Sequence, residues 1–260
     1  MQNTPYTVGM KLFEEFHDIP TRDNKKILGI LASPTGEVAL KPLIVFSHGI
    51  GTTISNVLLG NAAYYFENEG YNTYRFGYYH WAQGYRKLQE CTQGLHVQDL
   101  ETITEHFQEQ GANDITVIGH SFGGITPFLS RKIGATTSGV RVVGWDPSHP
   151  QSSLFEGAPP YEGNPDLTFF EGTFNAVVRQ DMVTEFKSLD MSEEVADFRP
   201  PSLIISAGGG DLQKAHMSLH EALGDNSTHH TIANADHGFF LTRTQEELFN
   251  QTAAWLQANS

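Results

Sequence analysis

The sequence predicts an α/β fold with a mainly parallel, twisted sheet that carries helices on both faces. Short apolar runs rich in β-branched residues alternate with longer segments of helical periodicity. Several of these runs are continuous rather than alternating with polar residues, which is typical of strands buried on both faces. A length of 260 residues suits one domain of this kind. We therefore expect strand–helix–strand units within a single domain that covers residues 1–260.

The first predicted elements form an antiparallel hairpin. Residues 14–20 and 26–31 are two extended runs joined by a polar turn, and Pro34-Thr35-Gly36 forms the next turn. Residues 42–47 are apolar throughout, as expected of a strand covered on both faces. The parallel part of the sheet is therefore predicted to begin at residue 42.

Helices and strands alternate in the next part of the chain. Residues 54–69 carry apolar side chains at helical spacing and are followed by Gly70, a helix-ending residue. A strand over 71–76 comes next. The helical pattern returns over 93–110 and ends at Gly111.

The remaining strands are short and apolar, and a helix closes the chain. The strands are predicted over 115–118, 140–145 and 203–206, with a shorter one around 229–232. The closing helix is predicted over 243–258. In such sheets the active site lies at the carboxyl ends of the strands.

A long segment separates the sixth predicted strand from the seventh. It holds more than fifty residues and several prolines, and loops of this length are uncommon in compact domains unless they have a function. We predict that residues 147–199 form an inserted lid or cap, with a helix at 184–191. The alternative is an ordinary surface excursion.

Composition excludes several classes of partner. With 16 Lys and Arg against 30 Asp and Glu, the formal net charge of −14 argues against nucleic acid and anionic membranes. The single cysteine, Cys91, permits no intrachain disulfide and no structural site of several thiolates. No apolar run reaches the ~18 residues of a membrane span, and the first residues lack a signal-peptide pattern. We expect a soluble, cytoplasmic protein without membrane insertion.

Residues Gly119-His120-Ser121-Phe122-Gly123-Gly124 follow the 115–118 strand and precede a helix-compatible segment. This pattern predicts a nucleophile elbow, a strained strand-to-helix turn that exposes a serine hydroxyl. Glycines are needed at such a turn because a Cβ would collide with neighbouring backbone. Ser121 is therefore the candidate nucleophile. The alternative is a glycine-rich turn whose serine caps the helix.

A serine hydroxyl is a weak nucleophile and needs a base, which in turn needs an orienting acid. His237 is the candidate base, because it follows the last strand and precedes the final helix. His229 and His230 lie within a strand pattern and are expected to be structural. A serine, acid, histidine order along the chain matches an elbow nucleophile.

Two aspartates compete for the role of the acid. Asp146 directly follows the 140–145 strand, and Pro147 restricts it to an extended conformation. Asp211 follows the 203–206 strand after three glycines. Either residue lies at a strand's carboxyl end, and Asp146 is favoured because its position is better defined. The non-catalytic alternatives are an Asp-Pro turn for Asp146 and a helix cap for Asp211.

Acyl transfer also requires hydrogen-bond donors for the oxyanion. One is expected from the amide of Phe122, just after the nucleophile. The second is assigned to the amide of Ile50 in the His48-Gly49-Ile50-Gly51 loop, with the Gly49 amide as the alternative. The alternative is that this loop is only a tight turn without a role in catalysis.

Together these segments resemble the α/β-hydrolase superfamily over nearly the whole chain. The 119–124 elbow is similar to that of platelet-activating-factor acetylhydrolases and many lipases. Asp146-Pro147-Ser148-His149-Pro150 resembles the Asp-Pro-x-x-Pro segment of pancreatic-type lipases, in which the acid follows the same strand. Most esterases of the superfamily instead carry the acid one strand later, where Asp211 lies. The lack of a signal peptide and of disulfides argues against triglyceride lipolysis.

The expected function is therefore a serine hydrolase, a carboxylesterase or lipase-like enzyme that cleaves a small-molecule ester through an acyl-enzyme and needs no cofactor or metal. A metal-dependent hydrolase is one alternative, because His216 and His220 lie four residues apart beside Glu221. A non-catalytic, hydrolase-like binding protein is another. The aromatic run Tyr78-Tyr79-His80-Trp81 either lines an acyl pocket or belongs to the core.

Overall fold

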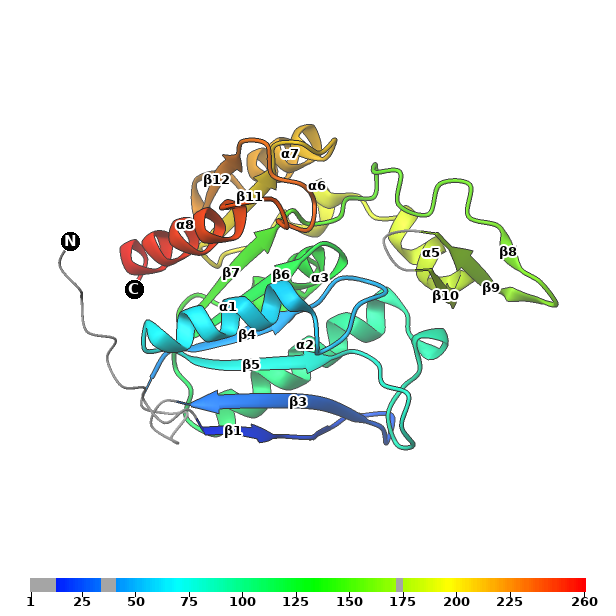
Figure 1. Ribbon diagram of the computed structural model, residues 1–260, viewed down its shortest axis with the longest axis horizontal. Helices are drawn as coiled ribbons and strands as arrows, with labels where there is room; N and C mark the ends of the chain where they lie inside the picture. Colours follow the sequence, from blue (N-terminus) through cyan, green and yellow to red (C-terminus); the bar gives the residue numbers. More distant parts are fainter. Residues whose placement is uncertain (1–12, 34–40, 172–174) are drawn as a thin grey trace.

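The computed structural model describes residues 13–33, 41–171 and 175–260. The predicted turn at Pro34-Thr35-Gly36 lies outside these residues. Within them the chain builds one large sheet with helices packed on both faces, and a smaller sheet to one side (Figure 1).

The large sheet is parallel in its centre and antiparallel at one edge. In spatial order its strands are β1 (Phe13–Phe16), β3 (Lys26–Ser33), β5 (Asn72–Gly77), β4 (Leu43–Ser47), β6 (Ile115–His120), β7 (Val140–Trp145), β11 (Ser202–Ala207) and β12 (Ser227–Ile232). All neighbours from β5 to β12 pair in parallel, whereas β3 is antiparallel to both β5 and β1. The two-residue strand β2 (Ile19–Pro20) also pairs with β3. The opening hairpin and the parallel centre agree with the sequence prediction.

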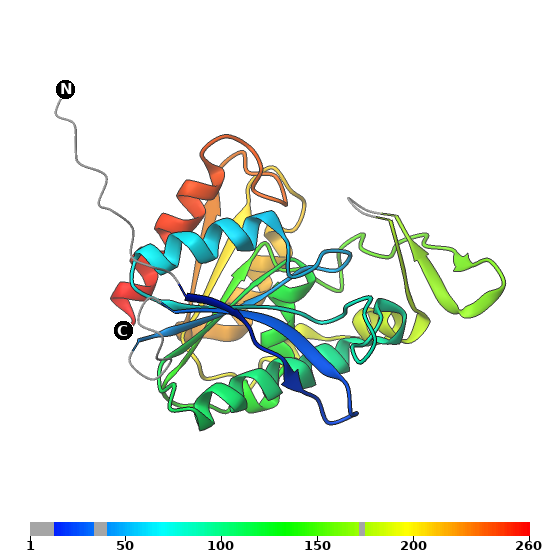
Figure 2. The ribbon, with the colours of Figure 1, turned by 60° about the horizontal axis from the view of Figure 1, so that its bottom comes forward.

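Helices cover the two faces of this sheet (Figure 2). The face that carries α1 (Val57–Asn68) and α8 (Thr244–Ala258) buries one apolar cluster. The opposite face carries α2 (Gln93–Glu109) and α7 (Gln213–Leu223) and buries a second. The shorter helical segments are α3 (Phe122–Ile125), α4 (Arg131–Gly134) and the 3₁₀ turns η2 (Leu88–Glu90), η3 (Thr126–Leu129) and η4 (Gly224–Asn226).

Strand β4 shows why both faces are covered. All five of its residues are buried; Leu43 and Val45 belong to one cluster, and Ile44 and Phe46 belong to the other. Successive side chains of a strand point to opposite faces, so a continuous apolar run feeds both cores. Each such side chain contributes about 1.5–3 kcal/mol when it is fully buried.

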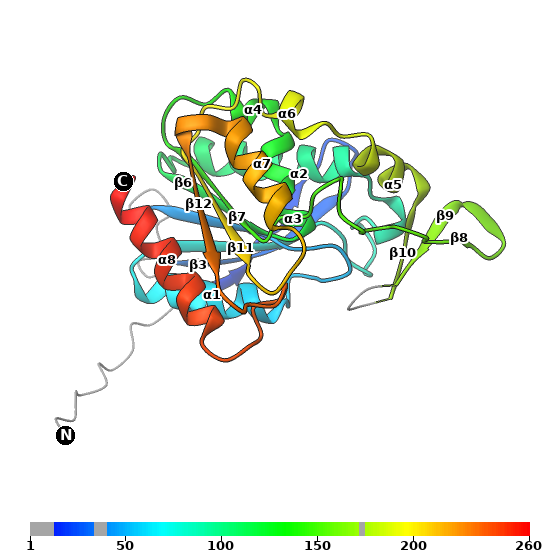
Figure 3. The ribbon, with the colours of Figure 1, turned by 90° about the horizontal axis from the view of Figure 1, so that it is seen from above.

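The segment between β7 and β11 forms a separate small sheet, which projects to one side of the molecule (Figure 3). Its strands are β8 (Pro160–Tyr161), β9 (Asn164–Phe170) and β10 (Ala176–Arg179), and two helices follow, α5 (Gln180–Lys187) and α6 (Met191–Glu194). The helix predicted at 184–191 is therefore wrong in its limits. Asp190 separates the two helices, because its Oδ1 accepts a hydrogen bond from the Ser192 amide and begins α6.

In the described residues, no helix has both the length and the apolar character needed to cross a bilayer.

Candidate active site

Ser121 lies on the turn between β6 and α3 and has φ 57° and ψ −125°, a strained conformation for a residue with a side chain. The residues two positions before and after it must be glycine. A Cβ at Gly119 would lie 2.1 Å from the Gly123 carbonyl oxygen, and one at Gly123 would lie 2.4 Å from the His48 carbonyl oxygen. The Ser121 amide donates to the Trp145 carbonyl at 3.1 Å, which extends the β6–β7 pairing by one residue. The turn thus has the geometry of a nucleophile elbow.

A hydrogen-bond chain leads away from the Ser121 hydroxyl. Its Oγ lies 2.8 Å from Nε2 of His237, and Nδ1 of His237 lies 2.6 Å from Oδ2 of Asp146. A carboxylate only accepts, so Nδ1 carries the proton and Nε2 is free to accept from the serine. This arrangement gives the imidazole the tautomer that a general base requires.

His237 is held by the loop between β12 and α8. Its carbonyl oxygen lies 2.7 Å from Nε2 of His120, which therefore donates. Burial lowers the pKa of His120 to about 4, so this ring is neutral near neutral pH. In the same loop, Oδ1 of Asp236 accepts from the amide of Phe240 at 2.7 Å. These bonds constrain the backbone that presents the imidazole.

Asp146 is almost fully buried at the end of β7 and has φ 41°, so the extended conformation expected before Pro147 is wrong. The neighbouring strand β11 holds it at two points. The Ala207 amide donates to Oδ1 at 2.8 Å, and the Asp146 amide donates to the Ile205 carbonyl at 2.7 Å. The two carboxylate oxygens thus have different partners: Oδ1 accepts from the backbone of β11, and Oδ2 accepts from His237.

Asp211 lies elsewhere. It is exposed at the rim of the cavity, and in the described part of the chain it makes no hydrogen bond to His237. The preceding glycines explain this, since Gly208 and Gly209 donate to the carbonyls of Ile232 and Ala235 and bind the turn to the chain after β12. Of the two candidate acids, the structure brings Asp146 to His237.

Behind Asp146 lies a polar network that sequence reasoning missed. Nε2 of the buried His216 donates to the Pro147 carbonyl at 2.7 Å, so in the neutral ring Nδ1 accepts from Ser206 Oγ, also at 2.7 Å. The same Nδ1 lies 3.7 Å from Asp146 Oδ1. Burial lowers the pKa of His216, which favours the neutral form.

This network does not fit a metal site. The proposed pair was His216 with His220, but both nitrogens of His216 bind protein groups and His220 bonds to Ser227 instead. No three His, Cys, Asp or Glu side chains gather as metal ligands among the residues that the structure describes. His216 instead braces the Asp146-Pro147 turn. The i, i+4 histidine spacing was visible in the sequence, but its partners come from other strands.

The loop after β4 packs directly on the elbow. A Cβ on Gly49 would lie 3.0 Å from Cβ of Ser121, so only glycine allows this approach without a shift. His48 orders the loop, because Nδ1 donates to the Gly49 carbonyl at 2.8 Å and Nε2 accepts from the Tyr78 amide at 3.2 Å. Burial lowers the pKa of His48 to about 4, consistent with this neutral tautomer.

A cavity of about 550 Å³ opens over Ser121 and His237. Its apolar walls are formed by Ile50, Leu58, Leu154, Phe170, Leu212 and Phe240. Gly49 also lines it, and two wall residues, Leu154 and Phe170, come from the segment between β7 and β11. Three carboxylates besides Asp146 line the cavity, Glu171, Asp211 and Asp236, and its described lining contains no Lys or Arg.

The aromatic run after β5 does not line this cavity. Tyr78 is buried and stacks on His96 with ring centroids 3.9 Å apart, and Tyr79 is buried against His48. Trp81 points to solvent and is 83% exposed. The run therefore contributes to the core and surface rather than to the walls around Ser121.

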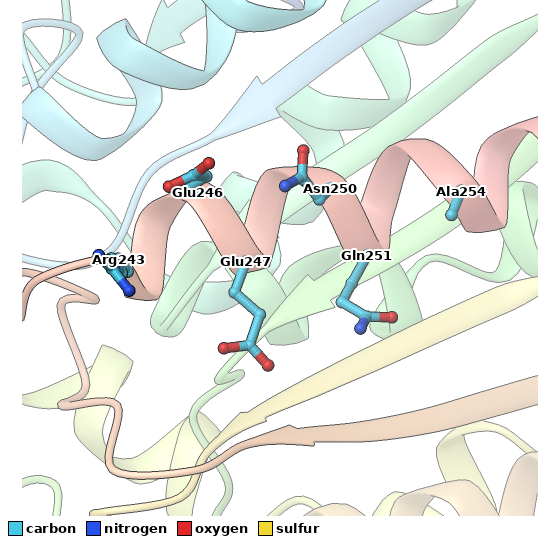
Figure 4. Close-up of a pocket in the computed structure, with 6 residues that line it drawn as sticks. All are labelled: Arg243, Glu246, Glu247, Asn250, Gln251 and Ala254. Carbon is cyan, nitrogen blue, oxygen red and sulfur yellow. The ribbon is translucent and has the colours of Figure 1, made fainter.

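A second hollow, of about 360 Å³, runs along α8. Figure 4 shows its lining side chains along α8, including Glu247 and Gln251, together with Arg243, the residue that precedes the helix. Ser121, His237 and Asp146 all lie in the other cavity. The candidate nucleophile and its two hydrogen-bonded partners therefore share that cavity.

Comparisons with known proteins agree with the architecture. Neither a scan against protein-family models nor a search of curated proteins finds a match to this chain. Solved structures do match. Est1E from Butyrivibrio proteoclasticus, solved with ferulic acid bound, superimposes with a TM-score of 0.75 at 16% identity, covering 93% of this chain and 98% of that one.

Two further structures resemble the chain over a similar length. An esterase domain from a Rhodothermus marinus protein has a TM-score of 0.72 at 15% identity and covers 95% of this chain and 98% of that one. A dienelactone hydrolase from Anabaena variabilis has a TM-score of 0.66 at 15% identity, with the same two coverages of 95% and 98%. The chain therefore has the α/β-hydrolase fold.

Proposed function

We propose that this protein is a serine hydrolase that cleaves carboxylic esters through an acyl-enzyme. The observation that carries the proposal is the hydrogen-bond chain from Ser121 through His237 to Asp146, which begins on a strained turn in the wall of an apolar cavity. A binding protein would have no use for a strained serine joined to a correctly tautomerised histidine. Asp146, rather than Asp211, is the proposed acid.

The residues act in two half-reactions. In acylation Ser121 Oγ attacks the ester carbonyl while His237 Nε2 takes its proton, and His237 then protonates the leaving alcohol as the C–O bond breaks. In deacylation His237 takes a proton from water, which attacks the acyl group; the bond from the acyl carbon to Ser121 Oγ then breaks, His237 returns the proton to Oγ, and the carboxylic acid leaves. The carbonyl oxygen becomes negative in both steps, and the Phe122 and Ile50 amides are its proposed donors, with Gly49 as the alternative to Ile50.

The cavity favours esters with an uncharged acyl group. Its walls are apolar, and the carboxylates of Glu171, Asp211 and Asp236 would repel an anionic substrate in the absence of a lining cation. Phe170 and Phe240 offer rings for an aryl group, and ester substrates of either aliphatic or aryl type belong in the assay. We propose that residues 147–199 act as the lid, since Leu154 and Phe170 complete the wall.

We place the enzyme in the cytoplasm, without a cofactor, a nucleic-acid partner or membrane insertion. The net charge of −14 argues against nucleic acid and anionic membranes, and the single cysteine fits a reducing compartment.

Labelling by a fluorophosphonate tests the proposal. The wild-type protein should react covalently, and Ser121→Ala should remove both labelling and hydrolysis of p-nitrophenyl esters of graded chain length. Ser218→Ala, an exposed serine on α7, is the matched control and should react like the wild type. Labelling that persists in Ser121→Ala, or ester hydrolysis that chelators abolish, would contradict the serine mechanism.

A further inference from the structure

A second serine lies beside the proposed nucleophile. Ser148 follows the Asp146-Pro147 turn, is 4% exposed and lines the same cavity. Its Oγ lies 3.3 Å from Oγ of Ser121, and its amide donates to the Ser121 carbonyl at 2.9 Å. In the described chain this is the only hydrogen bond of the Ser148 hydroxyl. The two serines are thus joined through both backbone and side chain.

The direction of the hydroxyl contact follows from counting protons. His237 Nδ1 carries the ring proton and donates a hydrogen bond to Asp146, so Nε2 is an acceptor and the Ser121 proton points toward it. Ser121 Oγ then has only lone pairs left for its other neighbour. Ser148 must therefore be the donor in the contact between the two hydroxyls.

At 3.3 Å this bond is longer than the ~2.8 Å usual between hydroxyls. A weak donor contact in the resting enzyme takes little nucleophilicity from Ser121. The same contact becomes a charge-assisted hydrogen bond when the serine oxygen gains negative charge, and such bonds are shorter and about twice as strong. An interaction that strengthens only along the reaction raises the rate of the chemical step.

We propose that Ser148 is a further catalytic residue, whose hydroxyl stabilises the negative charge that develops on Ser121 Oγ. This inference rests on the proposed function, because it concerns the same nucleophile. Charge develops on that oxygen twice: when its proton moves to His237 during attack, and when the bond from Oγ to the acyl carbon breaks during deacylation. His237 returns a proton to Oγ in the second case. The proton of Ser148 itself is never transferred.

Three variants separate this role from its alternatives. Ser148→Ala removes the donor and keeps the backbone bond to the Ser121 carbonyl, whereas Ser148→Thr keeps a hydroxyl donor. Ser218→Ala again serves as the control, because its side chain is exposed and Ser218 is not among the residues that line the cavity. Burst kinetics with p-nitrophenyl acetate give acylation and deacylation rates separately, and fluorophosphonate labelling gives the rate of attack by Ser121 alone.

We expect Ser148→Ala to slow acylation, deacylation and labelling by about 10-fold to 100-fold, the range for a lost hydrogen bond to a charged group. Ser148→Thr should recover most of this loss. The acidic limb of the pH profile of kcat/KM should keep its position in Ser148→Ala, because the hydroxyl of Ser148 bonds to Ser121 rather than to the imidazole. A structural defect that moved Asp146 would instead shift that limb.

The failures are distinguishable. Wild-type protein that fluorophosphonate does not label would overturn the proposed function, and the role of Ser148 with it. Normal labelling of the wild type, with Ser148→Ala within about 2-fold of it in all three rates, would overturn only the role of Ser148. An equal loss in Ser148→Ala and Ser148→Thr, or a shifted pH limb, would also overturn it.

Discussion

Replacing Asp146 by asparagine tests whether its carboxylate orients His237 as a base for Ser121. The carboxylate accepts from the Ala207 amide through Oδ1 and from His237 Nδ1 through Oδ2. In Asp146→Asn the amide oxygen keeps the Ala207 bond, which places the amide nitrogen against His237. That nitrogen donates, so Nδ1 of His237 must accept and the ring proton moves to Nε2.

The protonated Nε2 cannot take the proton of Ser121, so the base is lost although the fold is preserved. In serine hydrolases an error of this kind costs about 10⁴-fold in kcat, or roughly 5 kcal/mol of transition-state stabilisation. Asp211→Asn should lose less than about 3-fold, because Asp211 is exposed and only lines the cavity rim. The assay is kcat/KM on a p-nitrophenyl ester that the wild type hydrolyses, with thermal melts as the folding control. A larger loss for Asp211→Asn, or an Asp146→Asn enzyme with a tenth of wild-type activity, would refute this reasoning.

Two further predictions concern pH and charge. Burial lowers the pKa of both His48 and His120 from 6.5 to about 4, so below pH 6.5 the unfolded chain binds protons that the folded protein does not, and stability falls as pH drops toward 4. We expect each histidine to lower the free energy of unfolding by about 2 kcal/mol at pH 5. Urea unfolding at pH 7 and at pH 5 measures this difference. An unchanged urea midpoint would contradict the burial argument. For charge, p-nitrophenyl butyrate should be hydrolysed about 10-fold faster than the mono-p-nitrophenyl ester of succinate at low salt. The double change Glu171→Gln and Asp211→Asn should narrow this preference, and an equal preference in wild type and variant would show that these carboxylates do not select the substrate.

The features predictable from sequence were those with a local signal. The continuous apolar strands, the helices that end at glycine and the 119–124 turn each have a cause within a few residues. Asp146 was favoured over Asp211 for a local reason, its attachment to a strand end, and the structure brings Asp146 to His237. The helix predicted at 184–191 was misplaced because Asp190, read within it, acts as a cap.

Features that depend on packing between distant elements could not be predicted. The contact between Ser148 and Ser121 requires the ends of β6 and β7 to lie side by side, and no pattern in either segment reveals it. Likewise, His216 reaches Pro147 only because α7 packs on the face of the sheet beside β11 and β12. Tyr79 could be assigned to the core only after its contact with His48 was known.

Both Ser121 and Asp146 have positive φ, at the ends of adjacent strands. Glycine would adopt these backbone conformations with less strain, and residues held there cost about 1–3 kcal/mol each. At these two positions the residue that gives the higher thermal stability is therefore not the residue that catalysis requires. A selection for thermostability that ignored activity would favour glycine there and yield a sturdier protein without its nucleophile or its acid, so engineering of this chain should leave both positions unchanged and seek stability elsewhere.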